Sequence, residues 1–597
     1  MVTQQWILGT VPVQRGRARA LTWARSSNTG LLAMSLVVGA GAGLGAVVFR
    51  WLIKAFTEVL SGHADYAGLG HVANPHVPWL GRWFVLFAPV VAGLIYGPLV
   101  YRFAREARGH GVPEVMFAVA RRGGRIPPQV AVVKALASAL CIGGGGSVGR
   151  EGPIVQIGSA LGSTLGRIAR VAEPRMRVLV ACGAAGGIAA TFNAPLAGVF
   201  FAMELILRDF AAEAFGMVVV ASVTASVIGR AAFGNHPFLS LTSFSVDHLG
   251  QYPLFAALGV LAGVIGVFFS RTLYAVEDVC DALWTRTRGP EWARPAVGGL
   301  ALGGILLLLP QMYGVGYPVL GAGVAGHYGI ALLLILMVGK MVATSLTIGI
   351  GGSGGVFAPS LFVGAMVGSA YGQVLHQALP GVAGPAGAYG LIGMGAVFAG
   401  AARAPITAVV IMFELTGEYS IILPLMAAIV LATGVSHLIS RDTIYTRKLI
   451  RRGVDLDAVE GPAGRASAVE GRVDQVMEPV GAVLSEDITL REAVDAVTAS
   501  RNGQVAVLDK DGAYRGVLTA RALADALSDG QHDAQPVGSL VENPDAVVAD
   551  ATLASTLDAL ETAYGAVPVL DPSRSHLVGW LTHQRVLAAQ RGHNDRR

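Results

Sequence analysis

Long hydrophobic runs separated by short polar segments dominate the chain up to about residue 450. Seven of these runs are long enough to approach or cross a hydrocarbon layer of ~30 Å, so we expect them to form membrane helices. They are 31–56, 83–102, 213–231, 253–276, 293–309, 328–349 and 421–438. The pattern therefore predicts an all-α polytopic membrane protein over this part of the chain.

Further hydrophobic stretches are interrupted by Gly and Pro, and their unbroken pieces are too short to span alone. These stretches are 141–166, 182–206, 348–372 and 393–415. Backbone groups freed at such breaks cannot face lipid, so they must be buried in protein or line a polar cavity. The broken stretches are where we expect function to lie.

The broken stretches also repeat. Segment 132–168 aligns with 338–374 at an offset of 206, and a second block fits at an offset of 210. The matched pairs are Lys134/Lys340, Ser147/Ser353, Pro153/Pro359, Gly158/Gly364, Gly162/Gly368, Gly166/Gly372, Ala194/Ala404, Pro195/Pro405, Glu204/Glu414 and Leu205/Leu415. Paired, interrupted segments in two halves of a membrane protein indicate a transporter site near the midplane. The sequence leaves open whether the repeats are parallel or inverted.

The tail has a different pattern. Short β-rich runs at 505–508 and 567–570 are each followed by a turn and by Gly-x-Leu-Thr, at 516–519 and 579–582, leading into a helix. Each half of the tail is therefore predicted to be a small α/β module.

Composition supports this division. Charged residues make up 14% of the 597 residues against roughly 25% in soluble domains, hydrophobic residues reach 53%, and the mean hydropathy is +0.57. These values exclude a soluble globular protein and a disordered chain. Three cysteines cannot form a disulfide framework. Residues 472–597 carry 11 Lys+Arg and 18 Asp+Glu, whereas residues 1–471 carry 33 and 21, so only the first part is basic.

The basic excess flanks the hydrophobic region on both sides. The residues concerned are Arg15, Arg17, Arg19 and Arg25 before it, and Arg441, Arg447, Lys448, Arg451 and Arg452 after it. By the positive-inside rule we expect both ends in the cytoplasm, with the protein in the cell membrane and its tail cytoplasmic.

One broken stretch carries an ionisable pair. The sequence GGGGSVGREGP at 143–153 places Arg150 and Glu151 in an apolar region. A charged side chain is costly there, so an ionisable residue in such a place indicates a functional site. A structural ion pair between the two is the alternative. The glycine-rich approach to a helix start suits an anion, because backbone N–H groups and the positive end of the helix dipole face it. A carboxylate there can compete with the anion and leave when protonated.

Two further motifs share this design. GIGGSGGVFAPS at 349–360 has the same glycines and proline, but Phe357 stands where the first motif has Glu151. GHGVPEV at 109–115 leads into a helix through Pro113. Its His110 can donate to an anion, or be a hydrogen-bonded structural residue.

These three motifs, in this order, resemble those of the CLC family of chloride channels and proton-coupled anion exchangers. Residues 109–113 resemble the family's Gly-Ser-Gly-Ile-Pro, 149–153 read GREGP, and 355–359 read GVFAP. The resemblance covers about 30–450 and implies an all-helical homodimer with inverted repeats and one pore per subunit. The pore-motif residues that match are Gly109, Gly111, Pro113, Gly149, Arg150, Gly152, Pro153, Gly355 and Pro359.

The resemblance also implies roles for single residues. An anion, chloride or a relative, would be held by the side chains of His110 and Tyr445 and by the backbone N–H groups of Val356 and Phe357. Glu151 would be the external gate, moving into the anion's place when ionised. The expected function is anion transport gated by a protonatable glutamate, with no catalysis, metal or cofactor and no nucleic-acid partner.

Two positions depart from the family pattern. His110 replaces a serine, which leaves the anion preference open. Leu205 stands where exchangers commonly have the glutamate of the inner proton site, and the neighbouring Glu204 is turned by ~100° on a helix. Proton-coupled exchange is favoured because Glu151 and Tyr445 are present, and a passive chloride channel is the alternative. We expect Glu204 and Glu414 to cap or brace helices.

The tail resembles a pair of CBS domains at 472–530 and 536–592. The expected order of domains is therefore a cytoplasmic segment at 1–29, a membrane domain at 30–450, a linker at 451–471 and the two CBS domains. Such pairs often bind adenine nucleotides through an Asp that this chain replaces with Ala522 and Arg585. This argues against a nucleotide and leaves dimer support and ionic-strength sensing open. A CBS-containing cation transporter is a remote alternative, because cation pathways use carboxylate rings.

Overall fold

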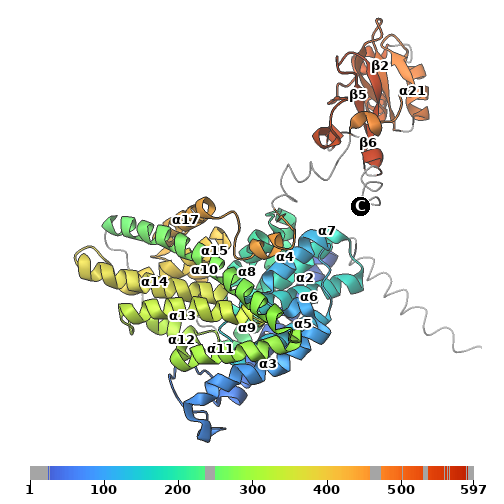
Figure 1. The fold of residues 1–597 in the computed structure, drawn as a ribbon. Helices are drawn as coiled ribbons and strands as arrows, with labels where there is room; N and C mark the ends of the chain where they lie inside the picture. Colours follow the sequence, from blue (N-terminus) through green and yellow to red (C-terminus); the bar gives the residue numbers. More distant parts are fainter. Residues whose placement is uncertain are drawn as a thin grey trace, which may run out of the picture. The chain divides into compact units, whose positions relative to one another are not determined.

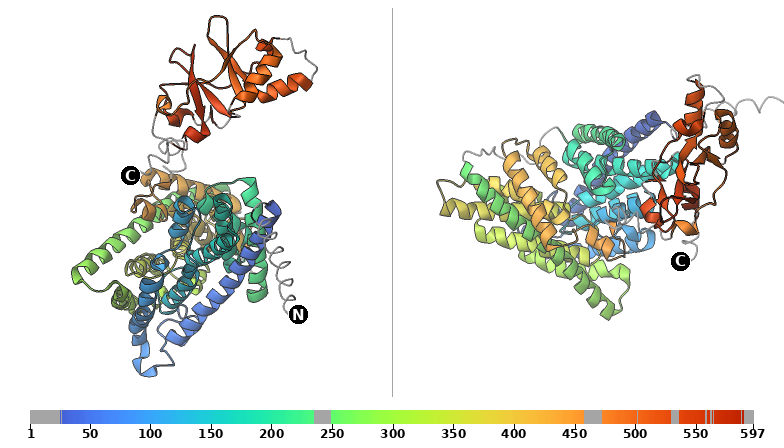
Figure 2. Two further views of the ribbon diagram at one scale, coloured as in Figure 1. Left: turned by 90° about the vertical axis from the view of Figure 1, so that its right-hand side faces the viewer. Right: turned by 90° about the horizontal axis from the view of Figure 1, so that it is seen from above.

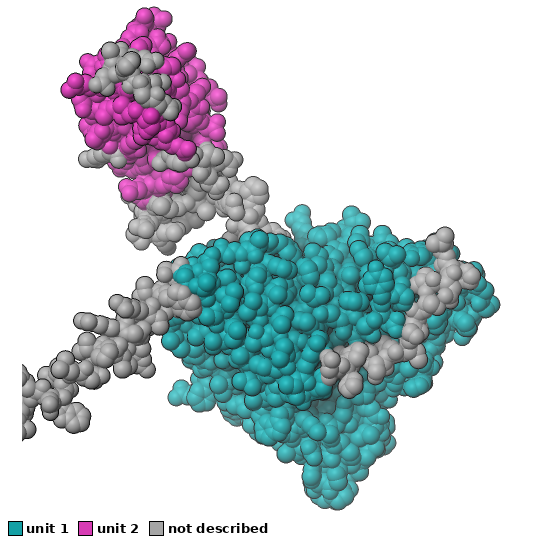
Figure 3. All heavy atoms as spheres, turned by 180° about the vertical axis from the view of Figure 1, so that it is seen from behind, with its two compact units in different colours: residues 1–454 teal, residues 455–597 magenta. Residues whose placement is uncertain are grey.

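The computed structural model describes Arg25, residues 27–234, 249–456, 472–500, 502–528 and 536–556, and most of 559–588. The chain divides into two compact units, Met1–Val454 and Asp455–Arg597 (Figure 3). Most of the expected N-terminal segment 1–29, and residues 457–471 of the expected linker, lie outside the described residues.

The first unit is built from helices, several of them short (Figure 1). In its first half these are α2 (Asn28–Ser61), η1 (Pro78–Trp83), α3 (Phe84–Phe103), η2 (Arg105–Ala107), α4 (Val112–Arg121), α5 (Gln129–Gly143), α6 (Glu151–Ala169), α7 (Glu173–Phe192), α8 (Pro195–Phe201), η3 (Ala202–Leu207) and α9 (Ala212–Phe233). The second half contains η4 (Leu249–Gln251), α10 (Tyr252–Thr287), η5 (Glu291–Ala293), α11 (Arg294–Leu308), η6 (Pro310–Met312), α12 (Tyr317–Val324), α13 (Ile330–Gly349), α14 (Phe357–Ala378), α15 (Ala386–Ala402), α16 (Pro405–Thr416), α17 (Ile422–Ile439) and α18 (Thr446–Ile450).

Among the described residues, seven helices are long and apolar enough to cross a membrane. Six of them contain predicted runs, but the run 293–309 does not reach this length, because it forms only the 15-residue helix α11. The seventh is α7, which is rich in Gly and Ala and whose second half the sequence interpretation assigned to the stretch 182–206, broken by Gly and Pro. Those small residues allow contact with α6: a Cβ on Gly183 would lie 2.0 Å from the carbonyl oxygen of Gly158.

The predicted breaks are present in all four stretches. Helix α5 ends at Gly143 before α6, α7 gives way to α8, α13 ends at Gly349 before α14, and α15 gives way to α16. The equivalent residues Gly149 and Gly355 form an antiparallel bridge, so the two short segments that contain them run in opposite directions.

The second unit contains two small sheets of the same topology (Figure 2). In each, the first strand is parallel to the second and the second antiparallel to the third, with a register shift before the last residue of the second strand. Along the chain, the first predicted module contains η7 (Val473–Gln475), β1 (Val483–Ser485), α21 (Leu490–Ala499), β2 (Gln504–Leu508), β3 (Tyr514–Thr519) and α22 (Ala520–Ser528), although Val473 of η7 packs in the core of the second sheet. Those of the second are η8 (Val537–Leu540), β4 (Val547–Val548), η9 (Leu553–Thr556), β5 (Ala566–Leu570) and β6 (Leu577–Thr582). The predicted pair of α/β modules is confirmed.

Candidate functional site

The three glycine-rich motifs meet inside the first unit. Gly149 and Gly355 exchange two backbone hydrogen bonds, with N···O distances of 2.7 and 2.6 Å. The N–H of Gly109 donates to the carbonyl of Gly352 at 3.0 Å, and Gly354 donates back to Gly109 at 3.3 Å. Segments separated by up to about 240 residues of sequence therefore form one backbone junction.

Glycine is required where the motifs touch. A Cβ on Gly152 would lie 1.9 Å from the carbonyl oxygen of His110, and one on Gly355 would lie 2.7 Å from the nitrogen of Gly152. Gly111 has φ +84°, a conformation that glycine adopts without steric cost. These contacts bring the first turns of α4, α6 and α14 together.

Two long helices begin at equivalent points of the repeat. Helix α6 starts at Glu151 and α14 starts at Phe357, with Val356 as its N-cap. The first backbone N–H groups of a helix have no partner within it and carry the positive end of its dipole. The junction therefore offers partial positive charge from both halves of the chain.

The carboxylate of Glu151 lies at the start of the other half's helix. It is 1% exposed, and its Oε1 accepts a hydrogen bond from the Tyr317 hydroxyl at 2.5 Å, while Oε2 lies 3.4 Å from the N–H of Ala358. The Arg150 guanidinium lies over the rings of Phe192 and Tyr317, at 5.9 and 5.2 Å from their centroids. The acid thus takes up donors that an anion could use.

A cavity of about 440 Å³ adjoins this carboxylate. Tyr317 and Arg150 line it together with Arg50, Lys54 and Asp65. Three cationic side chains and one carboxylate give the cavity a positive balance. Such a balance raises the local concentration of anions at the entrance to a site.

His110 is fully buried where α4 begins. Among the described residues neither of its ring nitrogens has a hydrogen-bond partner, and the ring meets that of Tyr274 edge-on with centroids 6.1 Å apart. A buried polar group without a partner is rare and calls for an explanation such as a ligand. The alternative, a structural His110 held by hydrogen bonds, does not agree with ring nitrogens that have no partner among the described residues.

The other predicted anion-contacting residues are also buried near the junction. The Phe357 ring lies between those of Phe192 and Phe398, with centroid distances of 5.8 and 4.5 Å. Tyr445 is 1% exposed and is the N-cap of α18.

Two buried lysines, which the sequence interpretation used only to align the repeats, brace the junction. Lys134 donates to the carbonyls of Ala107 and Gly109 at 2.9 and 2.7 Å. Its repeat partner Lys340 donates to Ser147 Oγ at 2.9 Å and to two carbonyls of the loop before α12. Lysine inside an apolar run, at equivalent places of both halves, was the available signal.

The two predicted capping glutamates each serve the other half. Glu204 accepts hydrogen bonds from the N–H groups of Ile406 and Thr407 at the start of α16. Glu414 accepts from the N–H groups of Leu196 and Ala197 at the start of α8. This confirms their structural role. Leu205 is buried in η3, which is a π-helical turn.

The tail shows what occupies the positions of the family's nucleotide-binding Asp. Ala522 and Arg585 each donate a backbone N–H to the threonine three residues earlier, at 3.1 and 3.3 Å. The Arg585 guanidinium pairs with Glu478 at 3.0 Å. The Arg585 guanidinium, which is paired with Glu478, cannot take the place of the carboxylate that would bind the ribose of a nucleotide.

These features define a polytopic helical membrane protein of the transporter class, with broken helices that converge on a buried site suited to an anion. Residues 92–437 match the voltage gated chloride channel family model, and residues 473–529 match that of the CBS domain. The chain belongs to this chloride channel family, and its tail contains a CBS domain.

Relatives in the family include a protein named as an exchange transporter and one named as a chloride channel protein. The chain is 34% identical over 428 residues to the H(+)/Cl(-) exchange transporter ClcA of Vibrio parahaemolyticus, covering 70% of this chain and 89% of the relative. It is 33% identical over 430 residues to a ClcB-like protein of Ralstonia nicotianae, named as a chloride channel protein, covering 71% and 98%.

Solved structures share the fold. A slow cyanobacterial Cl−/H+ antiporter superposes with a TM-score of 0.62 at 26% identity, over 71% of this chain and 97% of the other. A eukaryotic CLC transporter superposes with a TM-score of 0.60 over 93% of this chain and 97% of the other. Its sequence identity is 21%, so this similarity supports the fold alone.

Proposed function

We propose that the protein transports chloride or a related anion through the junction of the three motifs, with Glu151 as its protonatable gate. The observation that carries this proposal is the position of the Glu151 carboxylate, which lies against the first turn of α14 and accepts a hydrogen bond from Tyr317, a residue that lines a cavity rich in cations. A carboxylate in such a place blocks an anion while ionised and releases the place when protonated.

Groups with partial charges would make the direct contacts to the anion. One N–H of a neutral His110, the Tyr445 hydroxyl and the backbone N–H groups of Val356 and Phe357 supply partial charges. Conduction requires binding that is favourable enough for entry and weak enough for exit. The partnerless ring nitrogens of His110 support its place in this set.

We infer that the transport is exchange of the anion for protons. Relatives named H(+)/Cl(-) exchange transporters and a structural neighbour described as an antiporter support this inference. Passive chloride conduction is the second candidate, and the specific observation that favours it is Leu205. An apolar side chain there cannot relay a proton, so exchange requires water or another acid to deliver the proton to Glu151.

One measurement separates these two functions. The purified protein is reconstituted in liposomes, and the reversal potential is measured under crossed chloride and pH gradients. A reversal potential set by chloride alone refutes exchange, and a value between the chloride and proton potentials supports it.

Glu151 is tested in the same liposomes. Glu151→Gln is expected to abolish proton coupling and pH dependence while anion flux persists. Asp65→Asn is the matched control, because Asp65 lines the same cavity without contacting the gate and its replacement also removes one carboxylate. Persistent proton transport in Glu151→Gln is incompatible with its role as the gate.

The proposal also includes the expected location of the protein, its oligomeric state and the role of its tail. The protein would act in the cell membrane as a homodimer, with both termini and the tail in the cytoplasm. The tail would serve the dimer or sense ionic strength, with no adenine nucleotide bound.

A further inference from the structure

A second cavity lies where α3 ends and α11 begins, beside the start of the motif at 349–360. Its volume is about 260 Å³, and its lining includes Arg105, Arg108, Arg294, Glu291, Tyr101 and Ile350. No step of the proposed transport uses these side chains. Three guanidinium groups around a small cavity are typical of sites that bind phosphate or carboxylate.

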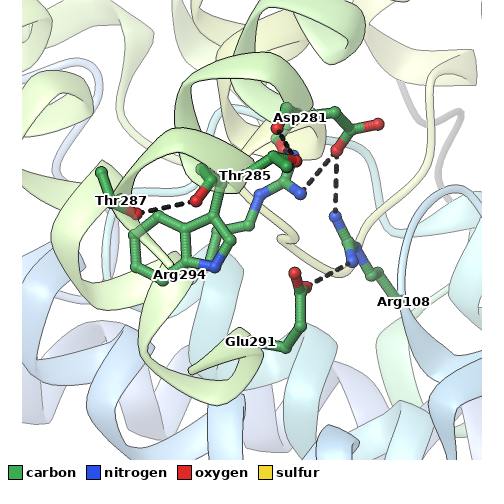
Figure 4. A network of polar contacts seen from close by, with 8 residues as sticks. Arg108, Asp281, Thr285, Thr287, Glu291 and Arg294 are labelled. Carbon is green, nitrogen blue, oxygen red and sulfur yellow. Dashed lines mark hydrogen bonds and ion pairs between the residues drawn. The ribbon is translucent and has the colours of Figure 1, made fainter. Parts of the chain in front are cut away.

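The charges of this cavity do not cancel. Arg108 lies between Asp281 and Glu291, at 3.8 and 3.3 Å, and Arg294 also pairs with Asp281 (Figure 4). In the described part of the chain, the two carboxylates thus pair with two of the three guanidinium groups. Arg105 stacks on the ring of Tyr101, with its guanidinium carbon 4.7 Å from the ring centroid.

Arg294 supplies an independent sign of a missing ligand. It is 5% exposed, and among the described residues its Nε has no hydrogen-bond partner. Its other nitrogens bind Asp281 and the carbonyl of Gly349. A buried guanidinium with an unused donor beside a cavity is costly unless an acceptor enters.

The cavity lies at the level expected for lipid headgroups. Arg105 follows the end of the membrane-spanning candidate Pro78–Phe103 by two residues. Exposed Tyr and Trp side chains are typical of a membrane interface, and here Tyr101 lines the cavity while Trp292 directly follows the lining residue Glu291. Exposed apolar side chains continue from there along the two helices, namely Val91, Leu94 and Ile95 on α3 and Val297 and Leu300 on α11. Acyl chains can lie on these faces.

We propose that this cavity binds the phosphate of an anionic phospholipid, whose acyl chains lie along α3 and α11. A volume of about 260 Å³ accepts a headgroup but not a whole lipid, since pockets for whole small molecules run from about 300 Å³ upward. The phosphate replaces Glu291 on Arg108. That ion pair is half-exposed and correspondingly weak, so its exchange for a phosphate costs little.

The site is coupled to the backbone of two pore motifs. Arg108 directly precedes Gly109, and Arg294 donates to the carbonyl of Gly349, where the loop leading to 355–359 begins. A phosphate that draws these guanidinium groups together therefore acts on both loops of the junction. This effect on transport rests on the proposed function, whereas lipid binding does not.

Binding is tested on the full chain in neutral detergent by thermal unfolding with a short-chain phosphatidylglycerol. A concentration-dependent rise in Tm is expected with this lipid and not with glycerol 3-phosphate or inorganic phosphate. Arg105→Gln is expected to weaken the apparent affinity about tenfold, the order of one charge-assisted hydrogen bond. Arg102→Gln is the matched control, because it removes an exposed cation one turn away that does not line the cavity.

The outcomes separate the alternatives. No rise in Tm with the lipid, or equal weakening by both substitutions, overturns the site. An equal rise with glycerol 3-phosphate overturns the lipid as its occupant. Chloride flux in liposomes with and without phosphatidylglycerol then reports the coupling, and a lipid effect that persists unchanged in Arg105→Gln refutes it without touching the proposed anion pathway.

Discussion

Tyr317 holds the proposed gate in its docked position. Its hydroxyl donates to Oε1 of Glu151 at 2.5 Å, and the carboxylate is buried. Tyr317→Phe removes this hydrogen bond and leaves the ring in place. A hydrogen bond to a charged group contributes about 1.5 to 3 kcal/mol, so the docking equilibrium should shift about 10- to 150-fold toward the open gate.

The direction of the pH effect follows from which state the hydroxyl stabilises. It donates to the ionised, docked carboxylate, so its loss favours the protonated and undocked one. Protonation then occurs at a higher pH than in the wild-type protein. At 1.36 kcal/mol per pH unit, the pH of half-maximal anion flux should rise by about one to two units.

Flux in liposomes as a function of pH measures this shift. Tyr313→Phe is the control, because Tyr313 lines the same cavity but donates to the carbonyl of Gly143 at 2.6 Å. It should lower stability by about 1 kcal/mol and leave the pH midpoint unchanged. Equal midpoints for Tyr317→Phe and the wild-type protein would show that this hydrogen bond does not hold the gate.

Two further predictions concern the anion site and the repeat. His110→Ser should change the order of anion preference while transport persists, because a hydroxyl replaces an imidazole donor; the same selectivity series in both proteins, measured from anion-substitution reversal potentials, would place His110 outside the site. Glu414→Ala leaves two backbone N–H groups at the start of α8 without acceptors and should cost about 2 kcal/mol or more in thermal unfolding, with Glu204→Ala losing a comparable amount at α16. Unchanged unfolding temperatures would contradict the capping role.

The positions of the breaks could be predicted from sequence because their causes are local. Glycine and proline interrupt a hydrophobic run wherever they cluster. The helix ends at Gly143 and Gly349 accordingly fall within the predicted broken stretches 141–166 and 348–372. The length of α7 was missed for the converse reason, since its glycines serve packing against α6 rather than a break.

The contacts of the site could not be predicted in the same way. Tyr317 and Glu151 are separated by 166 residues, and no local pattern in either segment indicates that they meet. The exchange of caps between Glu204 and Glu414 likewise depends on how the two halves pack. Repeat alignment showed that the positions were equivalent, but only the folded arrangement shows that each acid serves the opposite half.

The two halves are nearly symmetric at the junction, so the position at which they differ can be identified. Lys134 and Lys340 both anchor loops of the junction, and Gly149 and Gly355 pair with each other. Both halves therefore provide a helix N-terminus with a similar backbone. Where one half has Glu151, the other has Phe357, whose ring is packed between two phenylalanines. Under the proposed function, protons would act on the junction from the side of the carboxylate, whereas Phe357 on the opposite wall does not titrate. The proposed sensitivity to pH on one side of the pore would then follow from a single difference between two otherwise similar repeats.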